Sequence, residues 1–248
     1  MPLLATALGL SLLGSCGGLL VASSLLLFND AVRSRIVPWL VSYAVGALLG
    51  VALLALLPDA LKELDARTAF GTMLGGILAF FMLEKLVLIR HTHEHDVQIH
   101  PATAPLVILG DAFHNFLDGA IVCAAVLTSV SLGVNTAIAV AAHEIPQEVG
   151  DVAILLAAGY SRTGALILNV ASGAAGLAGA FVTYGAVNVL PGLRPFVLAF
   201  SSSSLLYIAM SDLIPDLHRG QIDRSAARQV ALIAAGIATV VVFERLAG

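Results

Sequence analysis

Two short polar motifs in otherwise apolar stretches carry the residues most able to do chemistry. The first motif, GDAFHNFLDGA, holds four polar side chains, Asp111, His114, Asn115 and Asp118. The second motif, HEIPQEVGD, holds five, namely His143, Glu144, Gln147, Glu148 and Asp151. Residues four apart share one face of a helix, so His114 lies beside Asp118 and the two motifs each present one polar face. Two antiparallel helices would bring these faces together.

The charge balance of these stretches favours a metal ion or protons as the partner of the carboxylates. Residues 101–127 and 134–159 contain no Lys or Arg. A charge at the centre of a bilayer costs about 2.5–3.5 kcal/mol, so acids there need a positive partner. Imidazole with carboxylate suits zinc and neighbouring first-row divalent ions. Asn115 and Glu144 would add a second, oxygen-rich position. The alternative is that these polar residues only pack and hydrogen-bond within the protein. That interpretation is weaker because a polar face occurs on two consecutive spans.

The composition is typical of an all-α polytopic membrane protein. The 248 residues are 59% hydrophobic and 11% charged, with a mean hydropathy of +0.98. A soluble domain carries about 25% charged residues, and a transmembrane helix needs about 20 apolar ones. Because the connections are short, we expect one transmembrane domain over residues 1–248. Its eight expected spans are residues 3–28, 36–57, 70–90, 101–127, 132–158, 163–189, 195–217 and 226–247.

The distribution of Lys and Arg predicts the orientation in the membrane. Eight spans put both termini on the same side. With the termini outside, eight of the 12 basic residues lie on the inner side and four on the outer side, as the positive-inside rule requires. We therefore expect a plasma (inner) membrane protein with extracellular or periplasmic termini. The histidine-bearing loop 91–100 is then cytoplasmic.

A faint internal repeat relates the second and seventh expected spans. YAVGALLGVALLALLPDA begins at Tyr43 and FSSSSLLYIAMSDLIPDL begins at Phe200. Aligned without gaps, Pro58-Asp59 falls on Pro215-Asp216. Because the two spans run in opposite directions, this pattern fits an inverted repeat of spans 1–3 and 6–8, as found in transporters. Chance similarity between two apolar helices is the alternative.

Other polar residues are candidates for an ion pathway. Pro146 has no N–H and crowds the carbonyl of Ala142, so we expect a kink that frees this oxygen. Asp59 is expected where an ion enters from outside. Glu148 and Asp151 are either pathway residues or only hydrated ones. The remaining pathway candidates are Asp111, Asp212, Asp216 and His218.

Both motifs resemble those of a known family. HNFLDG and HEIPQEVGD are similar to the fourth- and fifth-helix signatures of the ZIP (Zrt/Irt-like) metal transporters, and FFMLEK and LIPDL to its third and seventh helices. The resemblance implies an eight-helix bundle with extracellular termini and an alternating, elevator-like movement. It implies transport of a divalent metal, typically zinc, toward the cytoplasm. It carries a binuclear metal centre onto six residues, His114, Asn115, Asp118, His143, Glu144 and Gln147.

One position departs from the family pattern. The most similar branch reads HEIPHE in its fifth helix, so Gln147 stands where histidine is usual. An amide oxygen is a poorer ligand than imidazole, which puts the choice among zinc, iron, manganese and cadmium in doubt. The metal is expected as transported substrate, with no prosthetic cofactor. The expected partners are divalent metal ions and the lipid bilayer, with a homodimer left open and no nucleic acid.

Two other functions compete with transport by a carrier. HEIPQ nearly matches the H-E-x-x-H pattern of metalloproteases, in which two histidines bind zinc and the glutamate is the base. Here the second histidine is Gln147, and the pattern leaves the first motif unused. An ion channel could use the same acids but has less need of imidazole. We therefore expect no enzyme.

Overall fold

The computed structural model describes residues 2–25, 28, 30–91, 104–218 and 225–247. These residues form helices joined by short turns and contain no strand, which confirms the predicted all-α class. The elements are α1 (Pro2–Leu25), α2 (Asp30–Gly50), η1 (Val51–Leu56), α3 (Leu57–Leu61), α4 (Ala66–His91), α5 (Ala104–Thr128), α6 (Val130–Ala157), α7 (Arg162–Val189), η2 (Pro191–Leu193), α8 (Arg194–Tyr207), η3 (Ile208–Leu213), α9 (Ile214–His218) and α10 (Ser225–Ala247). Most of the predicted histidine-bearing loop, 92–100, lies outside the described residues.

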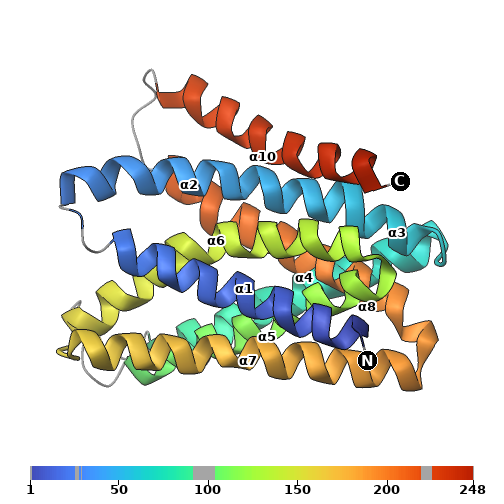
Figure 1. Cartoon of the computed structure of the whole chain (residues 1–248), viewed down its shortest axis with the longest axis horizontal. Helices are drawn as coiled ribbons and strands as arrows, with labels where there is room; N and C mark the ends of the chain where they lie inside the picture. Colours follow the sequence, from blue (N-terminus) through green and yellow to red (C-terminus); the bar gives the residue numbers. More distant parts are fainter. Residues whose placement is uncertain (1, 26–27, 29, 92–103, 219–224, 248) are drawn as a thin grey trace.

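Among the described residues, seven helical segments are long and apolar enough to cross a membrane. They confirm an integral membrane protein. α6 is not among the seven although it has 28 residues, since the polar motif HEIPQEVGD lies within it. Its role as the eighth span stays a prediction. Both chain termini lie at the same end of the molecule (Figure 1).

The helices form two groups that pack side by side. In the first group, α1, α5, α6 and α7 all contact one another. In the second, α10 lies along α2 and α4 lies along α8 (Figure 1). The two groups meet where α6 contacts α2 and where α5 contacts α8. Both polar motifs therefore lie in the first group, at or near its contact with the second.

Small residues line the contact between the two groups. One buried apolar cluster spans α2, η1, α3, α5, α6, α8, η3 and α10, and half of its buried members are alanines. Its alanines are Ala47, Ala52, Ala55, Ala60, Ala124, Ala125, Ala139, Ala199 and Ala209. Short side chains interdigitate less than long ones, so this contact is comparatively smooth.

Two π-helical turns interrupt the second group at matching places. η1 precedes Pro58 and η3 precedes Pro215, and each turn has six residues. A proline removes one backbone donor and crowds the preceding turn, and a π-turn is one way for a helix to accommodate this. The gap-free alignment of Pro58 with Pro215 also superimposes Val51–Leu56 on Ile208–Leu213. This coincidence in register supports the predicted repeat.

Side-chain caps begin the helices at both ends of the first group. The Ser129 hydroxyl accepts from Leu132 N at the start of α6, and the Ser161 hydroxyl accepts from Gly164 N at the start of α7.

A helix of the second group is capped by a carboxylate. At the start of α4, Asp65 accepts from Thr68 N and the Thr68 hydroxyl. These hydrogen bonds to its charged form lower the pKa of Asp65.

α5 and α7 approach closely because glycines lie between them. A Cβ on Gly179 would collide with the carbonyl oxygen of Phe116, and one on Gly119 with the backbone of Gly176. The backbone N–H and C=O groups at these positions form the hydrogen bonds of their own helices. Neither backbone can therefore shift locally to make room for an added Cβ. The glycines therefore fix the spacing of the helix that carries the first polar motif.

Replacing Gly179 by alanine is expected to lower the free energy of unfolding by about 1–3 kcal/mol through overpacking. Gly185→Ala on the same helix is the matched control, since nothing lies within 4 Å of a Cβ there. The control should be neutral or stabilising by about 0.5–1 kcal/mol. Thermal unfolding in detergent, followed by circular dichroism, measures both. Equal midpoints for the two variants would contradict the close approach of α5 and α7.

Candidate metal centre

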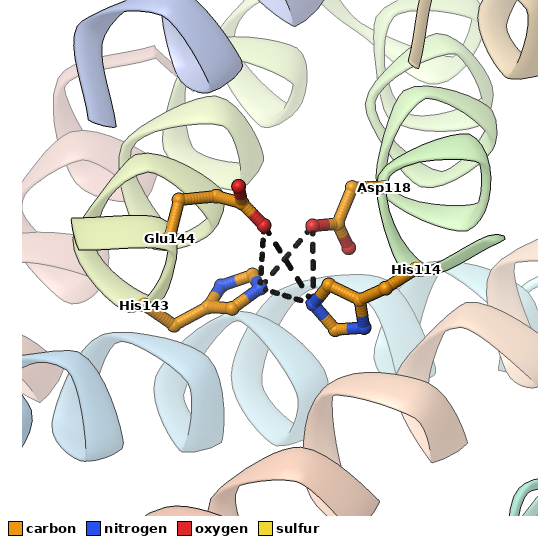
Figure 2. A group of neighbouring side chains, drawn as sticks. All are labelled: His114, Asp118, His143 and Glu144. Atoms are coloured by element: carbon orange, nitrogen blue, oxygen red, sulfur yellow. Dashed lines mark hydrogen bonds and ion pairs between the residues drawn. The ribbon is translucent and has the colours of Figure 1, made fainter. Parts of the chain in front are cut away.

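Four side chains from two neighbouring helices converge inside the first group (Figure 2). α5 supplies His114 and Asp118, and α6 supplies His143 and Glu144, each near the middle of its helix. One ligand atom from each residue lies within 4.8 Å of the other three. We call this set the four-residue centre. The two polar faces that the spacing predicted thus meet.

Five of the six separations within the centre are close to the edges of a tetrahedron around a metal ion, and the sixth, between the Asp118 and Glu144 oxygens, is at most 4.8 Å. His114 Nε2 lies 2.9 Å from His143 Nε2, 3.6 Å from Asp118 Oδ2 and 3.7 Å from Glu144 Oε1. His143 Nε2 lies 3.2 Å from the Asp118 oxygen and 3.6 Å from the Glu144 oxygen. Ligands about 2.0–2.2 Å from zinc stand about 3.3–3.6 Å apart in a regular tetrahedron. The measured edges therefore need shifts of only about 0.4 Å or less.

A backbone contact fixes the tautomer of one imidazole. His143 Nδ1 lies 3.2 Å from the carbonyl oxygen of Ala139, and a carbonyl only accepts, so Nδ1 carries the proton. Nε2 of His143 then presents a lone pair to the centre, which is the state a metal ligand needs. Since His114 Nε2 is 2.9 Å away, a single proton or a single metal ion fits between the two nitrogens.

The carboxylates of the centre are buried without hydrogen-bond donors. Asp118 is 2% exposed and Glu144 is fully buried, and none of their four oxygens has a hydrogen-bond partner. An unsatisfied buried polar group costs about 1–3 kcal/mol, and a charged one costs more. Neutral imidazole lone pairs facing these oxygens add repulsion. A cation at the centre removes both penalties at once.

The local sequence explains how the ligands reach their positions. The α5–α6 connection is a single residue, Ser129, so the two helices run antiparallel and their polar faces meet. α6 is helical throughout, including Pro146, so the predicted kink does not break the helix. On the other side, Gly18 of α1 leaves room for Glu144, because a Cβ there would lie 2.8 Å from the Glu144 Cβ.

The two predicted amide ligands are engaged beside the centre. Asn115 is fully buried, and its oxygen accepts from Ser15 at 3.1 Å while its nitrogen donates to Asp111. The Gln147 nitrogen also donates to Asp111 Oδ1, at 3.0 Å. That contact orients the amide of Gln147 and leaves its oxygen as the atom available to a metal.

The predicted pathway residues fall into three places. Asp111, Glu148 and Asp151 are buried next to the centre. Asp212 in η3 is exposed and interacts electrostatically with His143. Asp59 lies in a different region, in an ion pair with Lys62 at the edge of a pocket of about 290 Å³. The side chains of two further candidates, Asp216 and His218, lie outside the described part of the chain.

Two residues that support the centre did not stand out in the sequence. Ser15 holds the oxygen of Asn115, and Gly18 makes space for Glu144. Both lie in the small-residue run GSCGG of α1. The run itself is a visible signal of close helix packing, but the sequence does not reveal which helix packs there.

Comparisons with known proteins agree with this geometry. The family described as ZIP zinc transporter matches residues 90–244. Zinc transporter ZIP13 of Pongo abelii is 34% identical over 232 residues, which cover 86% of this chain and 70% of that protein. Zinc transporter ZIP13 of Homo sapiens is 31% identical over 272 residues, covering 86% and 73%. Zinc transporter ZIP4 of Homo sapiens is 44% identical over 110 residues, covering 44% and 17%. The chain belongs to the ZIP family of zinc transporters.

Proposed function

We propose that this protein transports zinc across a membrane, and that the four-residue centre binds the transported ion. One observation carries the proposal. One oxygen each of Asp118 and Glu144, both buried without donors, faces two imidazole nitrogens at 3.2–3.7 Å. The ZIP membership of the chain supports zinc as the substrate, and imidazole with carboxylate is a suitable zinc ligand set.

Exposure suggests where the ion reaches the centre. The side chain of His114 is 20% exposed, whereas those of Asp118, His143 and Glu144 are at most 2% exposed. His114 is therefore the ligand that meets a hydrated ion first. The three buried ligands then replace the remaining water, with Asp118 and Glu144 supplying the negative charge. Asn115 and the oxygen of Gln147 extend the centre toward a second, binuclear position.

The proposed mechanism is alternating access by movement of the first helix group. α1, α5, α6 and α7 contain all four ligands, and the contact with the second group is smooth and rich in alanine. The first group would slide against the second and expose the ion to the other side. In this orientation the termini and Asp59 are outside, α6 is the eighth span of a plasma (inner) membrane protein, and zinc moves into the cytoplasm.

The alternative functions have less support. In a metalloprotease, Glu144 would be the general base and residue 147 a histidine ligand. Here Glu144 joins the ligands, and the Gln147 nitrogen is bonded to Asp111. An ion channel requires weak binding at each site so that ions leave quickly, which four buried ligands do not favour. We therefore propose a carrier, without enzymatic activity.

Replacing one ligand should weaken zinc binding by the purified protein. His143→Ala is expected to lower the zinc affinity by more than about 10-fold, since loss even of outer-shell contacts costs about 10–100-fold. Thr136→Val on the same helix is the matched control, because this buried hydroxyl only bonds back to Leu132 O. Isothermal titration calorimetry in detergent measures both variants. Equal affinities for the two would exclude His143 as a ligand.

Transport itself is tested with radioactive zinc in proteoliposomes. Wild-type protein should give saturable uptake, and His143→Ala should lose most of it while Thr136→Val retains it. Iron, manganese and cadmium are added as competitors of zinc uptake. The order in which they reduce zinc uptake shows the metal selectivity of a site with an amide at residue 147. Failure of the intact protein to move any divalent metal would refute the transport proposal.

Uptake at low zinc should fall as the solution becomes more acidic. Zinc binds neutral imidazole, and imidazole ordinarily takes up a proton near pH 6.5. Protons therefore compete with zinc, and binding is strongest above that pH. Between about pH 7.5 and about pH 5.5 each competing imidazole lowers the apparent affinity by about 10-fold. An affinity that stays constant over this range would contradict imidazole ligation.

A further inference from the structure

A second group of buried acids lies beside the four-residue centre. Asp111 precedes His114 by about one turn on α5, and Glu148 and Asp151 follow Glu144 by about one and two turns on α6. Because α5 and α6 are antiparallel, these steps lead in the same direction, away from the α5–α6 connection. Asp111 is 4% exposed, Asp151 is 8% exposed and Glu148 is fully buried.

The three acids, which we call the acid cluster, lie close together. The carboxyl groups of Asp111 and Asp151 are near enough for their charges to interact. The Glu148 carboxyl is near enough to both for their charges to interact. Glu148 has no partner on either oxygen, and Asp111 and Asp151 each have one oxygen without a partner.

The helices of the first group offer no Lys or Arg near these acids. α1, α5 and α6 contain no Lys or Arg, and the only one in α7 is Arg162, at its first turn. The donors that do reach the acid cluster are the amides of Asn115 and Gln147, and both bond the same oxygen, Asp111 Oδ1. Four further oxygens of the acid cluster have no hydrogen-bond partner, namely Asp111 Oδ2, both oxygens of Glu148 and Asp151 Oδ2, which is costly in a dry interior.

α7 adds further oxygens at the level of the acid cluster. Gly173 and Gly176 of α7 pack against Asn115. Gly179 packs against Phe116 and Ala120, so α7 runs parallel to α5. Residues one turn before Gly173 therefore lie level with Asp111. One buried oxygen without a partner occurs there, Asn169 Oδ1, and a second, Ser172 Oγ, lies next to Gly173 and so at the level of Asn115.

We propose that the acid cluster is a separate cation-binding position beyond the binuclear centre, made only of oxygen ligands, that receives the divalent ion after the four-residue centre. The proposal rests on the proposed transport function. Among the described residues only the four-residue centre brings three or more ligand groups within 4.8 Å. The acid cluster is wider, so the ion keeps part of its water shell there. Gln147 links the two positions, since it follows His143 by one turn and donates to Asp111.

This chemistry predicts different metal preferences at the two positions. Imidazole favours zinc, whereas a set of carboxylates and water also accepts manganese. An ion that is only partly dehydrated binds weakly and leaves readily. Zinc held tightly at the four-residue centre would therefore gain a weaker position on its route out.

The test is manganese binding to the purified protein, followed by the electron paramagnetic resonance signal of free Mn²⁺, with zinc binding measured in parallel. Glu148→Gln and Asp151→Asn keep the side-chain shape and remove one charge each. Each is expected to lower manganese affinity by about 10-fold, since ligand charge sets affinity at oxygen sites, and to change tight zinc binding by less than about 2-fold. Glu63→Gln, which removes a partly exposed acid in the pocket region, is the matched control and should change neither.

The outcomes separate this proposal from the proposed function. His143→Ala should lose tight zinc binding and keep manganese binding. Manganese affinity that is unchanged in Glu148→Gln and Asp151→Asn would overturn the acid cluster as a site, even with transport intact. Loss of tight zinc binding in both variants would also overturn it, because the acids would then serve the centre or the fold. Zinc binding unchanged in His143→Ala would instead refute the centre.

Discussion

Two buried carboxyl groups on helices that contain no Lys or Arg constrain this structure most. Asp118 and Glu144 lie inside a bundle whose α5 and α6 contain no Lys or Arg. The structure places two imidazole nitrogens within 3.2–3.7 Å of their oxygens. Three neighbouring features hold these four side chains in place. Ala139 fixes the tautomer of His143, Gly18 admits the Glu144 side chain, and the α5–α7 glycines hold the first motif in place.

The membrane class and the convergence of the two motifs could be predicted from the sequence. Hydropathy reveals membrane helices, and spacing of four residues reveals a shared face, since both depend on local sequence alone. The contact of Gly18 with Glu144 could not be predicted, because it depends on how distant helices pair. The same holds for the amide of Gln147. Its type is visible in the sequence, but its bond to Asp111 depends on the register between α5 and α6.

The π-turns show a further limit of sequence reasoning. Pro58, Pro146 and Pro215 all lie in apolar spans, but a proline is compatible with a kink, a break or a wide turn. The structure has a wide turn before Pro58 and before Pro215, whereas α6 continues as an α-helix through Pro146. The two prolines that follow a wide turn lie in the second helix group, whereas Pro146 lies in the first. The two helices that hold the ligands, α5 and α6, contain no π-helical turn.

All four ligands come from one helical hairpin, and this has a consequence for the speed of transport. When α5 and α6 move together, no ligand has to be exchanged for another while the ion is carried. The intrinsic rate at which a metal replaces its ligands then affects loading and release but not the movement itself. The proposed movement would depend instead on lipid and on the apolar, alanine-rich cluster between the groups. Bilayer thickness and fluidity would therefore control the turnover of a loaded carrier more than the identity of its metal.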